Sequence, residues 1–430
     1  MKYSENLKDL RSFLILLATQ SFSALGSSMT SFALVIWSYQ QQGSALRTAL
    51  LTVCSYAPYV MVSIFAGAIS DRWNKKTIML VCDTFAAMCT LATAVLLHMG
   101  RLEIWHLYVL NALNGLMNTF QQPATDVTIT LITPKAHYQL ASGLRSLANS
   151  LCSILAPALA TAMLTLAGIH TVILFDLLTF AAAFVSLLFW IHIPVMEKSE
   201  EMQEPMLDMA KSGLLYLRKN PGILHLMLFL AAINFTASVY NAAFPAMVLS
   251  RAGGGQIALG VVNSVAGAAM IAGSILAGIW PKPKSRVRMI CNTLLLSMST
   301  ENFLLAFGRS LPVWCFGAVL GWIGIPLMNA NLDVIFRQYI PVEMQGRVYS
   351  ARNTLQFFTI PIGYVAGGYL VDRVFEPLMA LQEMESGLVM LFGSGKGSGA
   401  ACLFAILWLV GLMTCLVFRR DRHIWILEKE

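Results

Sequence analysis

The fold is decided by a short charged stretch, Gly67-Ala-Ile-Ser-Asp71-Arg72-Trp73-Asn74-Lys75-Lys76, which separates two long apolar runs. The runs cover approximately 46–69 and 77–98, and a helix needs roughly 20 apolar residues to cross the hydrocarbon core of a bilayer. Gly67 lets two helix ends approach closely, Asp71 places an anion at the membrane edge, and the cations after it can pair with carboxylates or lipid phosphate. The stretch therefore predicts two membrane-spanning helices joined by a short charged loop.

Apolar runs of similar length recur along the whole chain. Hydrophobic residues make up 57% of the sequence and charged residues only 12%, about half of the roughly 25% found in soluble domains. The first run is too long for a signal-peptide core and lacks a small-residue cleavage site, so we interpret it as an uncleaved span. We predict an all-α polytopic membrane protein with twelve transmembrane helices, the other ten at approximately 13–37, 104–123, 139–167, 171–192, 222–249, 257–280, 288–308, 313–335, 346–371 and 399–418.

The distribution of Lys and Arg predicts the orientation of these spans. Cytoplasmic loops of membrane proteins carry an excess of Lys and Arg. With the N-terminus in the cytoplasm, most of the 29 cationic residues fall on the cytoplasmic side, so we expect a multi-pass protein of the cell membrane with both termini cytoplasmic. The net charge of +7 is then a consequence of topology and no sign of nucleic-acid binding. The cationic residues left on the outside are Arg47, Arg101, Arg251, Arg309, Arg373 and Lys396.

A polar break and an internal repeat divide the chain into two halves. The segment 193–221 is charged and is expected to be a cytoplasmic linker between two six-helix bundles, 1–192 and 222–430. A shift of 207 residues places Asp126, Val127, Pro134 and Arg145 on Asp333, Val334, Pro341 and Arg352. The halves therefore look like parallel repeats, an arrangement in which a transporter binds its substrate at the repeat interface.

Other classes of site are absent from the sequence. The eight Cys and seven His residues are scattered, without CxxC or HExxH spacing, so neither a metal site nor a disulfide framework is expected. No set of His, Asp, Ser or Cys converges at one membrane face, and no soluble segment is long enough for a nucleotide-binding domain. We therefore expect neither an enzyme nor a cofactor. The glycine-rich segment 373–399 is interpreted as a flexible external loop.

The charged loop at 67–76 resembles the GxxxDRxxRK motif of the major facilitator superfamily, with Lys75 in place of Arg. The resemblance covers nearly the whole chain and implies the major facilitator fold. Finer similarity points to the drug-efflux, macrolide-efflux-like branch, through Gln345-Gly-Arg347-Val and the string Gly363-Tyr-Val-Ala-Gly-Gly-Tyr-Leu-Val-Asp372-Arg-Val-Phe-Glu376-Pro. The sequence departs from the family at span four, where Asn111 stands in place of an arginine used in proton coupling.

The resemblance implies a gating role for the charged loop and its counterparts. Asp71 would meet the N-terminus of span eleven, near Arg347, when the cytoplasmic side is closed. Asp126 would accept from Arg72 or Lys75, and Asp333 from Arg286 or Arg288. The repeat-related Arg145 and Arg352 are interpreted as gate or charge-pair residues, with snorkelling to the cytoplasmic interface as the alternative. The gating motif thus comprises Gly67, Asp71, Arg72, Lys75, Lys76, Asp126, Asp333 and Arg347.

Three carboxylates lie deep within the predicted spans: Asp83, Asp176 and Glu301. Charge inside a membrane is costly, so such residues are functional by default. They are candidates for proton coupling, led by Glu301 and Asp83, since burial favours the protonated form. Their positions on spans three, six and nine, which usually pack outside the cavity, leave a role in helix packing as the alternative.

The spans expected to line a central cavity carry amides and aromatic residues. Such side chains suit a bulky amphipathic ligand that forms no fixed charge pair, although many will instead bond helix to helix. The candidates for the substrate cavity are Gln20, Asn111, Asn114, Asn234, Tyr240, Asn241, Trp322, Asn329 and Gln356.

The leading hypothesis is a monomeric secondary exporter of hydrophobic or amphipathic, macrolide-like compounds, driven by the proton gradient without a bound cofactor. Its expected partners are the small-molecule substrate, protons and the lipid bilayer, with no nucleic acid. The alternatives are an exporter of siderophores or other metabolites, a lysophospholipid flippase, and, from another class, a non-transporting membrane sensor.

Overall fold

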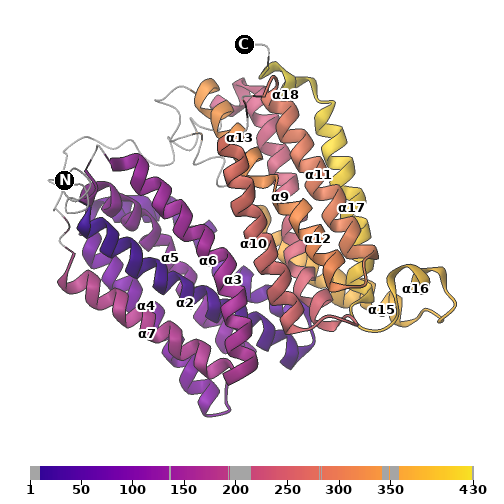
Figure 1. Cartoon of the computed structure of the whole chain (residues 1–430), viewed down its shortest axis with the longest axis horizontal. Helices are drawn as coiled ribbons and strands as arrows, with labels where there is room; N and C mark the ends of the chain where they lie inside the picture. Colours follow the sequence, from indigo (N-terminus) through magenta and orange to yellow (C-terminus); the bar gives the residue numbers. More distant parts are fainter. Residues whose placement is uncertain are drawn as a thin grey trace. The chain divides into compact units, whose positions relative to one another are not determined.

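The computed structural model describes residues 10–134, 137–191, 193, 215–279, 281, 283–340, 348 and 358–428, with the side chains of 63–72, 138–140, 142 and 337 excepted. Over these residues the chain forms helices and short connections and no strand (Figure 1). Ten of the helices are long and apolar enough to cross a membrane. The expected all-helical membrane architecture is confirmed.

The described chain clusters into two compact units. The first contains Met1–Ser38 and Leu51–Glu201, and the second contains Tyr39–Leu50 and Met202–Glu430. The hairpin of Tyr39–Leu50 thus packs with the C-terminal half, whereas the six-plus-six division of the sequence assigns it to the N-terminal bundle. The hairpin contains the end of α2 (Arg11–Gln42) and the start of α3 (Ala45–Arg72).

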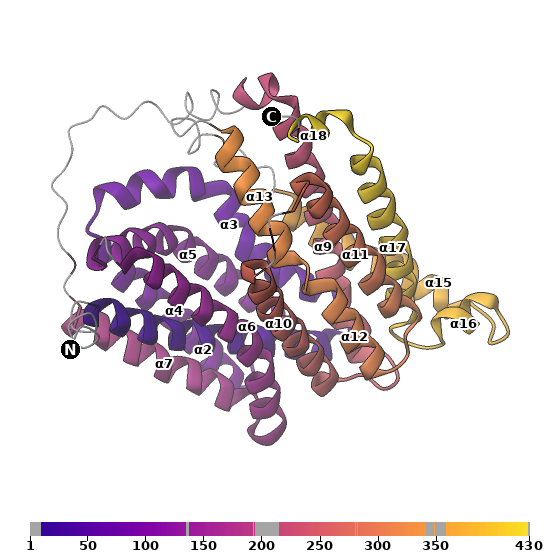
Figure 2. The ribbon, with the colours of Figure 1, turned by 45° about the horizontal axis from the view of Figure 1, so that its top comes forward.

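The first unit is a bundle of long helices that pack side by side (Figure 2). Gly115 of α5 shows how closely they approach, since a Cβ there would lie 2.0 Å from the Ser55 carbonyl oxygen of α3. Leu16, Met79 and Leu187 meet in one of its buried clusters. The helices are α2 (Arg11–Gln42), α3 (Ala45–Arg72), α4 (Lys75–His98), α5 (Ile104–Ile132), α6 (Tyr138–Ala167) and α7 (Ile169–Phe189).

The second unit has one large core that includes α9, a helix with 18 buried residues. Phe229 of α9, Ile290 of α11 and Phe336 of α13 are fully buried there. Its elements are α9 (Pro221–Ser250), α10 (Gln256–Ile279), α11 (Arg286–Phe307), α12 (Leu311–Trp322), α13 (Ile325–Tyr339), the π-helix η2 (Leu370–Phe375), α15 (Glu376–Ala380), α16 (Gly387–Phe392), α17 (Ser398–Arg419) and α18 (Arg422–Ile426).

The tenth predicted span is broken in the middle. Helix α12 ends at Trp322 and α13 begins at Ile325, with Pro326 in its first turn. Proline lacks an amide hydrogen and disfavours helical geometry in the residue before it, so the break falls where a proline is tolerated. Gly273 of α10 packs against this break, because a Cβ there would lie 2.1 Å from the Ile323 carbonyl oxygen.

The segment 373–399, interpreted from its glycines as a flexible loop, is largely folded. It contains the end of η2, α15, α16 and the start of α17. Arg309 donates to the carbonyl groups of Met390 and Leu391, and Arg251 donates to that of Phe392, so both cap the C-terminal end of α16. Residues distant in sequence therefore order a segment whose composition alone predicts flexibility.

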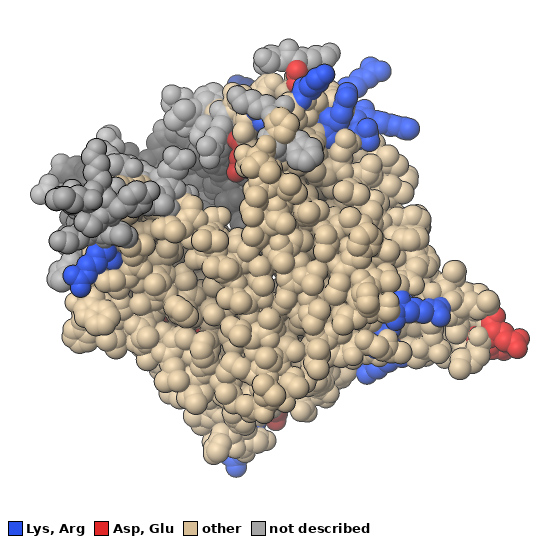
Figure 3. Space-filling view, viewed as in Figure 1, with Lys and Arg blue, Asp and Glu red and all other residues tan. Residues whose placement is uncertain are grey.

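Lys and Arg side chains of the second unit gather at the end that carries α18 (Figure 3). Arg288 lies over the Trp425 ring, and Arg419 and Arg422 flank the start of α18. The surface between this end and the end that carries α16 is almost free of charge in this view, as expected where helices face lipid.

Candidate functional site

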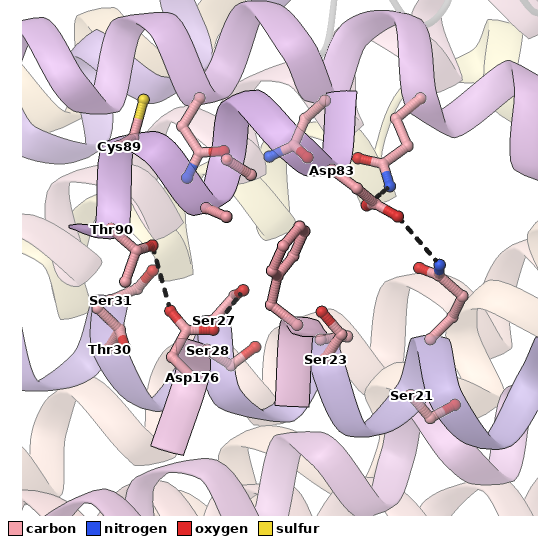
Figure 4. Close-up of a pocket in the computed structure, with 18 of the residues that line it drawn as sticks. Ser21, Ser23, Ser27, Ser28, Thr30, Ser31, Asp83, Cys89, Thr90 and Asp176 are labelled. Atoms are coloured by element: carbon pink, nitrogen blue, oxygen red, sulfur yellow. Dashed lines mark hydrogen bonds between the residues drawn. The ribbon is translucent and has the colours of Figure 1, made fainter. Parts of the chain in front are cut away.

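A cavity of about 610 Å³ lies within the first unit. Its walls come from α2, α4, α5, α6 and α7, with Ser55 of α3 (Figure 4). The volume falls within the roughly 300–1,000 Å³ typical of small-molecule sites. Of the amides predicted to line a substrate cavity, Gln20, Asn111 and Asn114 do so.

Helix α5 supplies one polar wall through residues spaced three or four apart: Asn111, Asn114, Asn118, Gln121 and Thr125. This spacing puts the five side chains on one face of the helix. The same face explains why α5 is not among the ten helices that qualify as membrane spans by hydropathy. The polar side chains on its cavity face lower the mean hydropathy of the helix.

Helix α2 supplies the opposite wall through small hydroxyl residues. Gln20, Ser23, Ser27 and Ser31 follow the same helical spacing and all line the cavity. Of these, the sequence analysis identified only Gln20. The pattern in Gln20-Ser-Phe-Ser-Ala-Leu-Gly-Ser-Ser-Met-Thr-Ser could have revealed the others, because one face of a span this rich in serine is too polar for lipid.

Asp83 of α4 is 6% exposed and borders the cavity. Its carboxylate accepts two amide hydrogen bonds, from Gln20 Nε2 at 3.3 Å and from Gln121 Nε2 at 2.5 Å (Figure 4). Both donors are neutral. Asp83 therefore joins α2, α4 and α5 through these two neutral amides.

Asp176 of α7 is 3% exposed and lies in the same cavity. It accepts from Ser27 Oγ at 3.0 Å and from Thr90 Oγ1 at 3.4 Å (Figure 4). Helix α2 packs closely here, since a Cβ on Gly26 would lie 2.5 Å from Thr179 Oγ1. Two buried carboxylates with neutral donors thus border one polar cavity, although spans three and six were expected to pack outside it.

Arg145 of α6 also lines the cavity and forms an ion pair with Asp126 of α5. The two atoms, Arg145 Nη2 and Asp126 Oδ1, are 2.5 Å apart, with side-chain exposures of 32% and 50%. Asp126 therefore pairs with Arg145, whereas the side chain of Arg72, one of its two expected partners, lies outside the described set. The role of Arg145 as a gate residue stays a prediction.

The charged loop between α3 and α4 is described only in part. Gly67, Asp71 and Arg72 lie in α3 where side chains are outside the described set. Lys75 is 8% exposed and donates to the Trp73 carbonyl. Lys76 Nζ donates to the carbonyl groups of Leu188 and Ile191 at 2.9 and 2.8 Å. Lys76 therefore caps the C-terminal end of α7, where a cation is favoured by the helix dipole.

The second unit contains a different carboxylate cluster. Glu301 of α11 is 6% exposed, and its Oε1 accepts from Tyr240 Oη of α9 at 2.8 Å and from Trp322 Nε1 of α12 at 3.0 Å. A Cβ on Gly321 would lie 2.0 Å from Glu301 Oε2, so only glycine fits beside the carboxylate. Tyr240 and Trp322, which the sequence predicts to line a substrate cavity, both donate to Glu301.

The remaining predicted residues of the second half fall in varied places. Asn234 is partly buried, its carbonyl accepting from Ser238 Oγ, while Asn241, Asn329 and Asp333 are exposed. Arg286, expected to reach Asp333, donates to Asn331 Oδ1 at 3.1 Å. The predicted residues that lie outside the described set are Arg347, Arg352 and Gln356.

An ionic cluster ties the start of α9 to the start of α18. Asp421 Oδ2 lies 2.5 Å from His225 Nδ1, and Asp421 Oδ1 accepts the His423 amide at 2.9 Å. Burial acts to raise the pKa of Asp421, but the hydrogen bonds from His225 and His423 outweigh it and hold this pKa below its ordinary value. Within the described chain, no group of three His, Cys, Asp or Glu residues could hold a metal ion.

Comparison with known proteins identifies the family. The family model described as Major Facilitator Superfamily matches residues 16–364. Macrolide efflux protein A of Streptococcus pyogenes is 22% identical over 366 residues, covering 84% of this chain and 90% of its own. Multidrug efflux pump Tap of Mycolicibacterium fortuitum is 22% identical over 373 residues, covering 84% and 88%.

Solved structures of low sequence identity share the fold. The nucleoside transporter NupG aligns with a TM-score of 0.68 at 14% identity, covering 94% of this chain and 98% of its own. A bacterial homologue of the iron transporter ferroportin also gives a TM-score of 0.68, at 15% identity, covering 96% and 98%. Both are transporters, as are the relatives found by sequence, and the expectation that the chain is not an enzyme is confirmed.

Proposed function

Because the chain belongs to the major facilitator superfamily, we propose that it is a secondary active exporter of hydrophobic or amphipathic small molecules, working by alternating access. Its relatives include a macrolide efflux protein and a multidrug efflux pump. By analogy with them, we propose that its substrates are bulky, macrolide-like compounds. We also propose that the transporter works as a monomer.

The observation that carries this proposal is the polar cavity of the first unit. Its amide and hydroxyl walls on α2 and α5 can form hydrogen bonds to many different ligands, because each group can donate or accept. Apolar residues such as Leu34, Leu107 and Phe180 supply the rest of the wall. A mixed lining of this kind suits amphipathic compounds of varied shape.

The proposed driving force is the inward flow of protons in exchange for substrate. Asp83 and Asp176 support it, since each borders the cavity and accepts hydrogen bonds from neutral amide or hydroxyl donors. Such a carboxylate can take up a proton without leaving a cation unpaired. Glu301 is the third candidate, but its hydrogen bonds from Tyr240 and Trp322 favour a role in packing α9, α11 and α12.

The proposed orientation places both termini in the cytoplasm and the protein in the cell membrane. The gathering of Lys and Arg at the α18 end of the second unit supports it, because cytoplasmic ends are enriched in these residues. In this orientation the charged loop with Asp71 lies on the cytoplasmic side. There we assign Asp71 the gating role that the family motif implies.

A transport assay in cells tests the proposal. The chain is expressed in a bacterial host that lacks its main efflux pumps, and accumulation of a radiolabelled macrolide and of a fluorescent amphipathic dye is measured. We expect lower accumulation than in vector-only cells, rising to the vector level when a protonophore collapses the proton gradient.

The matched variants are Asp83→Asn and Glu383→Gln, which remove one carboxylate each, the first at the cavity and the second at an exposed site on the segment between α15 and α16. Glu383→Gln should export normally. Equal accumulation in vector and wild-type cells for every compound tried would contradict export, and export insensitive to the protonophore would contradict proton coupling.

A further inference from the structure

The most densely bonded carboxylate in the described chain that the proposed function leaves unused is Asp372. It lies in η2, the π-helical segment that follows the eleventh span and precedes α15. A π-helix is rare and is frequently found at functional sites. Asp372 was singled out in the sequence only as part of a family-like string.

The Asp372 carboxylate caps the start of α3. Its Oδ1 accepts the Ala45 amide at 2.9 Å, and its Oδ2 accepts the Leu46 amide at 2.9 Å and Ser44 Oγ at 2.6 Å. Ala45 and Leu46 are the first residues of α3, whose amide groups have no partner within the helix. The helix dipole adds a favourable interaction with the negative charge.

Ser44 completes the cap. Its hydroxyl donates to Asp372 and accepts the Arg47 amide at 3.1 Å, which is the usual geometry of an N-cap serine. Three amide groups at the start of α3 are therefore satisfied, two of them by a residue more than 320 positions away in the sequence.

Close packing holds the carboxylate at this position. A Cβ on Gly368, one turn before Asp372, would lie 2.4 Å from the Leu46 Cα, so the two helices touch backbone to backbone. On the other side, Glu376 Oε1 accepts the amides of Gly397 and Ala400 at 3.0 and 3.2 Å and so caps α17. Asp372 thus caps the start of α3, and Glu376, four residues later, caps the start of α17.

The hairpin that Asp372 contacts connects α2 and α3, two helices that lie mostly in the first unit. Tyr39–Leu50 is part of the second unit, whereas the rest of α2 and α3 belongs to the first. Tyr39 Oη lies 2.6 Å from Ser250 Oγ at the end of α9, which adds a second contact between this hairpin and the C-terminal half. The outer ends of α2 and α3 are tethered to η2 by these bonds.

We propose that Asp372 is an outer gate residue, which holds the α2–α3 hairpin on the C-terminal bundle in one state of the transport cycle and releases it in the other. This inference rests on the proposed export function and on the predicted topology, which places the hairpin outside the cell. It mirrors the role that the family motif implies for Asp71 at the opposite end of α3. Asp71, at the end of α3, would cap the start of the eleventh span, and Asp372, at the end of the eleventh span, caps the start of α3.

Amide hydrogen exchange tests, without a substrate, whether Asp372 stabilises the α2–α3 hairpin. The purified full chain in lipid nanodiscs is compared with Asp372→Ala, Asp372→Asn and the charge control Glu383→Gln. We expect amides of 43–50 to exchange about tenfold faster in Asp372→Ala, because they lose charge-assisted acceptors. Peptides of α9 and α11 should exchange as in the wild type, which shows that the variant is folded. Unchanged exchange of the amides of 43–50 would contradict the proposal that Asp372 stabilises the hairpin.

Transport tests the gate. In the accumulation assay both Asp372 variants should lose most of their export, Ser44→Ala should lose less because the two amide bonds remain, and Glu383→Gln should lose none. Faster exchange with full export in Asp372→Ala would overturn the gating role. If wild-type cells export none of the compounds, the proposed function fails by itself, and the exchange experiment still decides whether Asp372 holds the hairpin.

Discussion

Helices α2 and α9 open the two halves of the chain, yet they do different work. In the most apolar 18-residue stretch of α9, 61% of the residues are buried, whereas in the corresponding stretch of α2 only 33% are. Helix α9 buries most of its residues, and its Tyr240 donates to Glu301. Helix α2 turns a face of serine and glutamine toward a cavity that also contains Asp83 and Asp176. Related sequences in a repeat therefore need not share a role.

The same contrast separates the carboxylates of the two bundles. Those of the first unit border a cavity that a ligand or water could enter, so their protonation can change during a cycle. Glu301 is enclosed by an aromatic pair and by Gly321, which leaves it no space to exchange partners. We infer that the first unit carries the changing chemistry and that the second provides a rigid counterpart.

The largest effect is expected for Asp83→Asn. If Asp83 is the proton carrier, export against a gradient should fall by about a hundredfold, within the range for loss of a proton-transfer group. Binding of the dye and downhill exchange should persist, because the amide keeps the cavity polar. Uptake into proteoliposomes with and without an imposed pH gradient separates the two. Full uphill transport by Asp83→Asn and by Asp176→Asn would place coupling elsewhere.

Glu301 should respond in the opposite way. Glu301→Ala leaves the Tyr240 hydroxyl and the Trp322 ring nitrogen without their acceptor, at a cost of about 3 kcal/mol in stability. Glu301→Gln keeps an acceptor oxygen and should cost about 1 kcal/mol, with coupled export preserved. Thermal unfolding in detergent, read beside proteoliposome transport, checks both. Normal stability with lost coupling in Glu301→Gln would make Glu301 the carrier.

The ion pair between Arg145 and Asp126 should have an intermediate effect. Arg145→Gln should lower export about threefold to tenfold, and Arg145→Lys should restore part of it, because lysine keeps the charge but lacks the planar fork. Stability should change by less than about 1 kcal/mol, since both side chains are partly exposed. Normal export by Arg145→Gln at normal expression would indicate that the pair has no gating role.

The smallest effect is expected for Asp421→Asn. The change weakens the cap of α18 and the bond to His225, at a cost of about 1 kcal/mol. Because the folded pKa of Asp421 is lowered, its contribution is present above the unfolded value of about 4 and is lost as pH falls through the folded value. Unfolding of wild type and variant should therefore differ at pH 7 and converge in acid.

Prediction from sequence succeeded where periodicity and composition determine structure. The apolar runs at 77–98 and 222–249 correspond to α4 and α9 within a few residues. Gln20 and Asn111 were identified as cavity residues because polar groups in a span need a polar neighbour. The sequence did not reveal that Tyr240 and Trp322 donate to Glu301, because an amphipathic side chain fits a cavity and a buried carboxylate equally well. Their place in a substrate cavity stays a prediction.

The sequence by itself determined the helical membrane architecture, the positions of most spans and the presence of three buried carboxylates. These follow from local composition, since a bilayer admits only long apolar helices and makes every embedded charge conspicuous. Only the tertiary structure decided which partner each carboxylate meets: amides for Asp83, aromatic donors for Glu301 and the start of α3 for Asp372. Those partners lie tens to hundreds of residues away, and hydrogen bonds depend on distance in space, which no local pattern encodes.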